Sequence, residues 1–315
     1  MATMRPLIEQ RADPHIHKHE DGYYYFTASV PGYDRLELRR AASIEALAEA
    51  PPITVWRKPE SGPFSELIWA PELHHHRDRW YLYLAAAPSR EIRNGLFQHR
   101  MYAISTEAAD PLTGTWSSPV QVETGVDSFC LDATTFVHQG RLYYVWAQKA
   151  PDIPGNSNLY IAPMETPESI SGPPVRLSVP EFEWETRGFS VNEGPAVLCR
   201  HGRVYLTYSA SATDENYCMG MLWADADADL LDPASWTKSP TPVFESDPPN
   251  AIFGPGHNSF TVAEDDQTDL LVYHARTYTE IEGDPLWDPN RHTYVKRIHW
   301  DVDGFPLFGK PSSRD

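Results

Sequence analysis

The amino-acid sequence predicts an all-β fold, and within that class a five-bladed β-propeller. The 315 residues include 10 Trp, 16 Tyr, 12 Phe and 29 Pro. Because aromatic residues favour strands and proline ends helices, this composition argues against an all-helical fold. Five segments also share one pattern, in which a polar or acidic start is followed by a short strand, a turn and a strand rich in Tyr and Trp. Their starts lie 59 to 64 residues apart, a period that radially repeated sheets predict and a β-sandwich does not.

Each repeat supplies the elements of one blade in the same order. A hairpin comes first, and residues 21–22, 139–140 and 201–202 (Asp-Gly, Gln-Gly and His-Gly) are suited to its turn. A further short strand follows the hairpin in four repeats, at 101–106, 159–164, 219–224 and 294–300. Similar loops at 110–116 and 232–238 then lead to a last strand. The stretch 41–50 predicts only a short helical turn, because Pro51 and Pro52 end it. We therefore expect residues 1–315 to form a single propeller domain.

Charge and terminal sequence exclude several classes of partner. The formal net charge is −18, and without a basic run such a chain repels phosphate backbones, so we expect no nucleic-acid partner. No stretch approaches the ~18 apolar residues of a membrane span, so we expect no membrane partner. The N-terminus lacks the apolar stretch of a secretory signal, which favours a cytoplasmic enzyme. Nothing in the sequence specifies an oligomeric state.

Five residues at equivalent repeat positions are predicted to meet near one end of the axis, because the first strand of each blade lines the central channel. They are Asp13, Glu72, Asp132, Glu193 and His257. Carboxylates packed together raise each other's pKa and cost stability, so such a cluster indicates chemistry or a bound cation. Glycoside hydrolysis needs this set: an acid that protonates the leaving oxygen, a carboxylate that activates water, and a modulator of the acid. For Glu72, capping of a strand start is an equally good interpretation.

Aromatic residues just before the axial positions are candidates for stacking on a sugar ring. Trp69, Phe129 and Phe189 hold these places, although packing between blades is an alternative role for each. The segments 88–100 and 278–291 are candidate loops at the rim of the site.

Six short motifs together resemble glycoside hydrolase family 43, whose members are five-bladed propellers that invert the anomeric centre. They are RADPH at 11–15, WAPE at 69–72, LDAT at 131–134, NEGP at 192–195, GPGHNS at 254–259 and YHAR at 273–276. The resemblance implies that Asp13 is the general base, Glu193 the general acid and Asp132 the carboxylate that tunes the acid. It also implies that Arg276 reaches toward the sugar and that His257 lies beside a calcium ion or an ordered water. Apart from that calcium it implies no cofactor, and it gives Glu72 no catalytic role.

Within the family, three segments look most like the exo-acting α-L-arabinofuranosidases, including those that act on α-1,5-linked arabinan. They are residues 33–41, 65–75 and 286–301. We therefore expect release of terminal L-arabinofuranose from arabino-oligosaccharides. A β-xylosidase, or an enzyme with both activities, is the alternative. That subgroup often has an additional arabinose-binding module, and because the sequence ends at Asp315 we expect short oligosaccharides as substrates.

Two other classes of protein remain in competition. A non-catalytic lectin would keep the aromatic residues but would not need three axial carboxylates. A transition-metal protein would use the histidines of two strands, which are His15, His17, His19, His74, His75 and His76. We interpret these histidines as lining the pocket rim or facing solvent, because no carboxylate or cysteine nearby completes a ligand set. A β-fructosidase is discounted, since its WMNDPNG-like motif is absent from the sequence.

Overall fold

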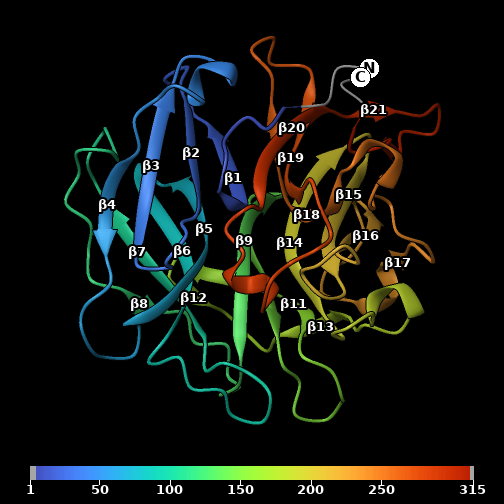
Figure 1. The fold of residues 1–315 in the computed structure, drawn as a ribbon, viewed down its shortest axis with the longest axis horizontal. Helices are drawn as coiled ribbons and strands as arrows, with labels where there is room; N and C mark the ends of the chain where they lie inside the picture. Colours follow the sequence, from blue (N-terminus) through green and yellow to red (C-terminus); the bar gives the residue numbers. More distant parts are fainter. Residues whose placement is uncertain (1–4, 313–315) are drawn as a thin grey trace.

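The five sheets of the protein surround a central axis, and the prediction of a five-bladed β-propeller is confirmed. The computed structural model describes residues 5–312. In Figure 1 the chain colours progress around the molecule from blue to red, so that the first and last blades are neighbours. Helical structure in the described residues consists of short 3₁₀ turns: η1 (Glu45–Leu47), η2 (Glu183–Glu185), η3 (Pro233–Ser235), η4 (Pro248–Asn250) and η5 (Pro285–Trp287). The first of these is the short turn expected within 41–50.

The first two blades are four-stranded antiparallel meanders in chain order. Blade 1 contains β1 (Ala12–Lys18), β2 (Tyr24–Ser29), β3 (Arg35–Ala41) and β4 (Ile53–Arg57). Blade 2 contains β5 (Glu66–His76), β6 (Arg79–Ala87), β7 (Arg100–Thr106) and β8 (Val120–Gln121).

The other three blades repeat the meander with small variations at the outer edge. Blade 3 contains β9 (Cys130–His138), β10 (Arg141–Gln148), β11 (Asn158–Thr166), β12 (Ser169–Ile170) and β13 (Val175–Ser178), and both β12 and β13 pair with β11. Blade 4 contains β14 (Asn192–Arg200), β15 (Arg203–Ala210), β16 (Cys218–Asp225) and β17 (Thr237–Lys238). Blade 5 contains β18 (Phe253–Val262), β19 (Asp269–Arg276) and β20 (His292–Arg297), and a small ribbon of β21 (His299–Trp300) and β22 (Pro306–Leu307) follows.

The ring closes where the N-terminal segment meets the last blade. The Leu7 N–H donates to the Thr293 carbonyl at 2.7 Å, and the Ser259 hydroxyl donates to the Pro14 carbonyl at 2.8 Å. Buried aromatic and aliphatic side chains fill the spaces between blades, among them Trp80, Trp146, Tyr83, Tyr144 and Tyr273. The aromatic richness of the sequence therefore forms the core between the sheets.

Every inner strand contains a β-bulge, and one residue in each bulge has left-handed backbone geometry. These residues are Asp13 (φ 54°), Ala70 (φ 44°), Asp132 (φ 48°), Gly194 (φ 54°) and His257 (φ 43°). A bulge redirects a side chain and interrupts the ladder of hydrogen bonds. The five bulges therefore turn the start of each inner strand toward the channel at the same level.

These bulges define which residues of the repeats are equivalent. The left-handed bulge residue of β5 is Ala70, and Glu72 lies two residues beyond it. The corresponding residue of β14 is Gly194, and Glu193 lies one residue before it. The prediction that Glu72 is equivalent to Asp13 is therefore wrong by two positions, although both residues face the channel.

Among residues 5–312, no helix has the length and apolar character needed to cross a membrane.

Candidate active site

A cavity of about 170 Å³ lies at the end of the channel where the inner strands begin. Seven of the nine candidate residues line it, and Glu72 and Arg276 do not: the seven are Asp13, Asp132, Glu193, His257, Trp69, Phe129 and Phe189. Both predicted rim loops contribute as well, through Ile92 to Phe97 on one side and Asp284 to Arg291 on the other. The structure thus joins segments that are nearly 280 residues apart in one site.

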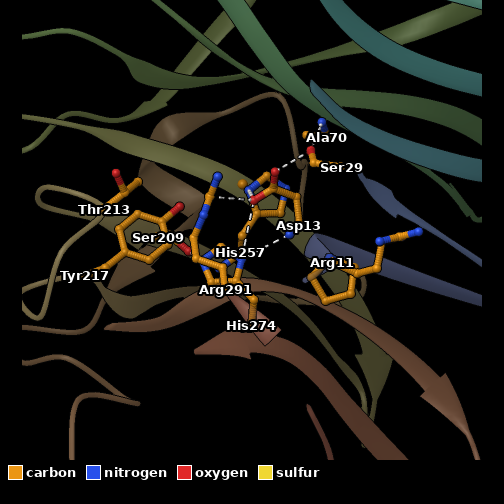
Figure 2. A network of polar contacts seen from close by, with 12 residues as sticks. Arg11, Asp13, Ser29, Ala70, Ser209, Thr213, Tyr217, His257, His274 and Arg291 are labelled. Carbon is orange, nitrogen blue, oxygen red and sulfur yellow. Dashed lines mark hydrogen bonds and ion pairs between the residues drawn. The ribbon is translucent and has the colours of Figure 1, made fainter. Parts of the chain in front are cut away.

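The Asp13 carboxylate is held by partners from other strands (Figure 2). The Ser29 hydroxyl donates to its Oδ2 at 2.5 Å, and Nη1 of Arg291 approaches its Oδ1 at 3.3 Å. His257 Nδ1 lies 3.4 Å from the same Oδ1. The backbone N–H of Asp13, freed by the bulge, donates to His274 Nδ1 at 3.0 Å. These contacts fix both the strained backbone and the direction of the carboxylate.

Asp13 is kept ionised by this surrounding. Burial alone raises the pKa of Asp13, but His257, Arg291 and His274 outweigh it and hold that pKa well below its usual value. Burial lowers the pKa of His257, and lowers the pKa of His274 to about 3, so both imidazoles are neutral at neutral pH. Arg291 is therefore the lasting positive charge beside Asp13.

Glu193 differs from Asp13 in its protonation state. Burial, with a contribution from the negative charge of Asp13, raises the pKa of Glu193 to about 7. The Tyr217 hydroxyl donates to Glu193 Oε1 at 2.9 Å and opposes this rise. Burial raises the pKa of Tyr217 well above its ordinary value, so the phenol keeps its proton. Glu193 is thus a carboxylic acid that holds a proton close to neutral pH.

Asp132 lines the same cavity and is influenced by both of these groups. Burial and then the negative charges of Glu193 and Asp13 raise the pKa of Asp132 well above its usual value. Its Oδ2 accepts the backbone N–H of Gly194 at 3.1 Å and lies 3.7 Å from His257 Nδ1. Because Asp132 and Glu193 interact, they titrate as a pair.

The aromatic candidates combine packing with exposure to the cavity. The Trp69 ring stacks on His99 with 3.9 Å between centroids and meets Tyr33 edge-on at 5.9 Å. Phe129 packs edge-on against the same His99 at 5.8 Å. Phe189 also lines the cavity, and 53% of its surface is exposed. Trp69 and Phe129 therefore pack against neighbouring aromatic rings and also line the cavity, whereas Phe189 is a rim residue.

The structure does not bring Arg276, which the resemblance implied to reach toward the sugar, into the cavity lining. It is 2% exposed, and its guanidinium donates to the carbonyls of Thr213 (2.5 Å) and Pro285 (2.7 Å). Arg276 therefore supports the loop that follows β19. The arginine at the cavity is Arg291, the last residue of the predicted rim loop 278–291, which the sequence analysis did not single out.

The strand histidines also differ from the prediction. His15 and His74 are buried rather than exposed at a rim, and Glu72 lies between them. The argument that no carboxylate completes a ligand set is therefore wrong. The reason is that Glu72 lies deeper in the channel than predicted, at the level of His15.

The resemblance implies a calcium ion beside His257, so the side chains around His257 must be suited to bind it. Calcium takes six to eight oxygen ligands. In the described part of the chain, the groups of side chains that are close enough to hold an ion do not include His257. His257 is thus not part of a direct side-chain ligand set among these residues, and we derive no catalytic step from such an ion.

A cavity that keeps one carboxylate ionised and another protonated has the division of charge used by glycoside hydrolases. The comparisons with known proteins identify the family. The chain belongs to glycoside hydrolase family 43, since the sequence model of that family, "Glycosyl hydrolases family 43", matches residues 3–306. The predicted family is thereby confirmed.

Individual relatives are similar over nearly the whole chain. An "Extracellular exo-alpha-(1->5)-L-arabinofuranosidase" of Streptomyces avermitilis is 54% identical over 97% of this chain. A protein with the same name from Streptomyces chartreusis is 50% identical over 89% of this chain and 84% of its own length. The crystal structure of an α-L-arabinofuranosidase from Lactobacillus brevis has a TM-score of 0.97 and 59% identity, and the match covers 99% of this chain and 98% of that one. The chain spans 63% of the length of the Streptomyces avermitilis protein.

These relatives contradict the prediction of a cytoplasmic enzyme. Both Streptomyces proteins are named extracellular. The prediction relied on the absence of an apolar N-terminal stretch from the sequence, and that observation does not decide the compartment.

Proposed function

We propose that the protein is an inverting, exo-acting α-L-arabinofuranosidase that releases terminal L-arabinofuranose from α-1,5-linked arabino-oligosaccharides. The observation that carries the proposal is the contrast between Asp13, held ionised by Arg291, and Glu193, whose pKa is raised to about 7, in one cavity. The names of relatives that are 50–59% identical favour arabinofuranoside over β-xyloside as the substrate.

The proposed reaction is a single displacement. Asp13 accepts a proton from a water molecule as the water oxygen bonds to the anomeric carbon. The bond from that carbon to the leaving oxygen breaks, and Glu193 gives its proton to the leaving oxygen. Asp13 then loses its proton to solvent and Glu193 regains one. Inversion needs about 6.5–9.5 Å between the two carboxyl groups to admit the water, and this separation is our prediction for Asp13 and Glu193.

Asp132 is assigned the role of orienting the acid. It holds the Gly194 N–H, which adjoins Glu193 in the strand. The aromatic side chains Trp69 and Phe129 and the rim residue Phe189 would pack against the bound sugar.

Two substitutions with two substrates test the roles. Glu193→Gln should lower kcat on an arabino-oligosaccharide by about 10²–10⁴-fold, because its poor leaving group needs the proton. The same variant should lose much less activity on a nitrophenyl α-L-arabinofuranoside, whose leaving group needs no acid. Asp13→Asn should lose activity on both substrates, since both need the activated water. Equal losses for Glu193→Gln on the two substrates would refute its role as the acid. Sugar binding by the native protein without turnover, unchanged in Glu193→Gln, would indicate a lectin.

Product analysis tests the reaction as a whole. On linear α-1,5-arabino-oligosaccharides, arabinose should be the first product, and NMR of the early reaction should show it with inverted configuration. Retained configuration, early internal cleavage, or faster hydrolysis of a nitrophenyl β-xyloside would contradict the proposal.

A further inference from the structure

Beyond the catalytic cavity the channel continues into a second cavity of about 260 Å³ that is open to solvent. All five inner strands line it, and the positions two residues beyond the bulges form one layer of its wall. That layer consists of His15, Glu72, Thr134, Ala196 and Ser259. The proposed reaction uses none of these residues.

Three potential ligands gather on one side of this cavity. Glu72 Oε2 lies 2.8 Å from His74 Nε2 and 3.7 Å from His15 Nε2. One ligand atom from each of the three side chains lies within 4.8 Å of the other two. His15 and His74 are 8% exposed and Glu72 is 6% exposed, so the group is buried in the wall of the channel.

The surroundings orient His74 as a metal site requires. The Thr135 hydroxyl lies 3.0 Å from His74 Nδ1, on the ring edge away from Glu72, and contacts His76 Nε2 at 2.9 Å. Such a bond on the far nitrogen fixes the tautomer of a ligating histidine. His15 Nδ1 is buried and has no hydrogen-bond partner among the described residues.

Charge compensation is also missing around Glu72. Within residues 5–312 its ion pairs are with the two imidazoles, and neither a lysine nor an arginine pairs with it. Lys18 lines the same cavity, but its ammonium group pairs with Asp266 at 2.5 Å. A buried carboxylate is stabilised by a partner of opposite charge or by a metal ion.

We propose that His15, Glu72 and His74 bind a divalent transition-metal ion of the zinc class. Two imidazole nitrogens and one carboxylate oxygen form a ligand set that zinc accepts, with water in the fourth position. The nitrogen ligands favour such an ion over calcium or magnesium, which prefer oxygen. Because His15 belongs to β1 and the other two ligands belong to β5, the ion would link blade 1 to blade 2.

A second histidine cluster nearby supplies a matched control. His19, Glu20 and His75 also bring ligand atoms within 4.8 Å of one another, but they lie at the partly exposed surface of the same two blades. A double variant, His19→Gln with His75→Gln, removes this surface cluster and leaves the channel group intact.

The experiment is titration of the chelator-treated protein with Zn²⁺ by calorimetry, with metal content measured after dialysis. One ion per chain is expected for the native protein and for the surface double variant. Glu72→Gln keeps a polar group beside His74 but removes the charge, and it should weaken binding by at least about 100-fold. His15→Gln should weaken Zn²⁺ binding to the same extent. It serves as the test of the channel site if Glu72→Gln does not fold.

Two independent readouts accompany the titration. Zn²⁺ should raise the thermal midpoint of the native protein but not that of either channel variant, and bound Co²⁺ should give the visible absorption of a four-coordinate site. Binding that is lost in the surface double variant and kept in Glu72→Gln would overturn the proposal. Failure of the native protein to bind Zn²⁺ or Co²⁺ saturably would overturn it as well.

Discussion

Removal of the Tyr217 hydroxyl should move the alkaline limb of the pH profile upward. In Tyr217→Phe the donor to Glu193 Oε1, at 2.9 Å, is lost. This bond stabilises the ionised carboxylate, so its loss raises the pKa of Glu193, which is about 7 in the native protein. Activity that needs protonated Glu193 should therefore persist to higher pH.

The size of the shift follows from the strength of the bond. A hydrogen bond to a charged group contributes about 1.5–3 kcal/mol, and one pKa unit corresponds to about 1.4 kcal/mol. The full loss would raise the pKa by about 1–2 units. Because Glu193 is only half-buried and water in the cavity replaces part of the bond, we expect about 1 unit.

The assay is kcat/KM against pH on an arabino-oligosaccharide, whose leaving group requires the acid, because kcat/KM reports the pKa values of the free enzyme. The limb should move from about pH 7 toward pH 8 while the acid limb stays in place. Tyr25→Phe is the matched control, because it removes a 2.7 Å bond from a tyrosine to the Asp21 carboxylate far from the cavity. A limb that stays fixed or moves downward in Tyr217→Phe would refute the assignment of Glu193 as the titrating acid.

Four further substitutions at three positions probe the carboxylates and their surroundings. Ser29→Ala should lower the free energy of unfolding by about 1–3 kcal/mol, measured by urea denaturation, because Asp13 loses a buried donor. Arg291→Met should lower it by about 3–5 kcal/mol and abolish most activity, since a buried carboxylate is left without its cation; an unchanged urea midpoint would contradict this. Asp132→Asn should keep the native free energy of unfolding to within about 1 kcal/mol, because its amide oxygen still accepts the Gly194 N–H. The free energy of unfolding of Asp132→Ala should be about 1–3 kcal/mol lower than that of Asp132→Asn, because this acceptor is lost. Equal thermal midpoints for the two Asp132 variants would show that this bond is unimportant.

The fold was predictable because each blade repeats the same local chemistry. Hairpin turns such as Asp21-Gly22 and His201-Gly202 end paired strands that are rich in aromatic residues, and the repeat period places them around an axis. Both features depend on residues close together in the sequence. The positions of Asp13, Asp132 and Glu193 at one cavity followed from this period.

The depth of each side chain in the channel was harder to predict. The sequence reasoning aligned Glu72 with Asp13 because both are acidic. Proline is the better marker, since it is tolerated at a bulge, and Pro14, Pro71 and Pro195 each follow the left-handed residue of their strand. Alignment on these prolines gives Asp13, Ala70 and Gly194 as equivalents and moves Glu72 two residues deeper, next to His15.

The roles of the arginines depended on contacts that sequence patterns do not specify. Arg276 precedes the rim loop 278–291 and Arg291 ends it, and either was suited to face the cavity. Carbonyl groups of Thr213 and Pro285 hold Arg276 in the wall, whereas Arg291 is free to meet Asp13. Loop conformation decides between them, and it depends on segments that are distant in the sequence.

The bulges explain why the scaffold and the active site cannot be separated. A left-handed backbone costs a non-glycine residue about 1–2 kcal/mol, and each bulge also frees an N–H from the strand ladder. Side chains accept these N–H groups: His274 accepts that of Asp13, Ser29 that of Ala70, Asp132 that of Gly194 and Ser209 that of His257.

Ser29 and Asp132 therefore each satisfy a bulge and belong to the catalytic network at once. Hydrogen bonds that hold the strained backbone also orient the carboxylates, so the strain is offset within the site itself. It follows that changes at these accepting side chains alter stability and activity together, whereas changes at Phe189 on the rim should alter activity alone.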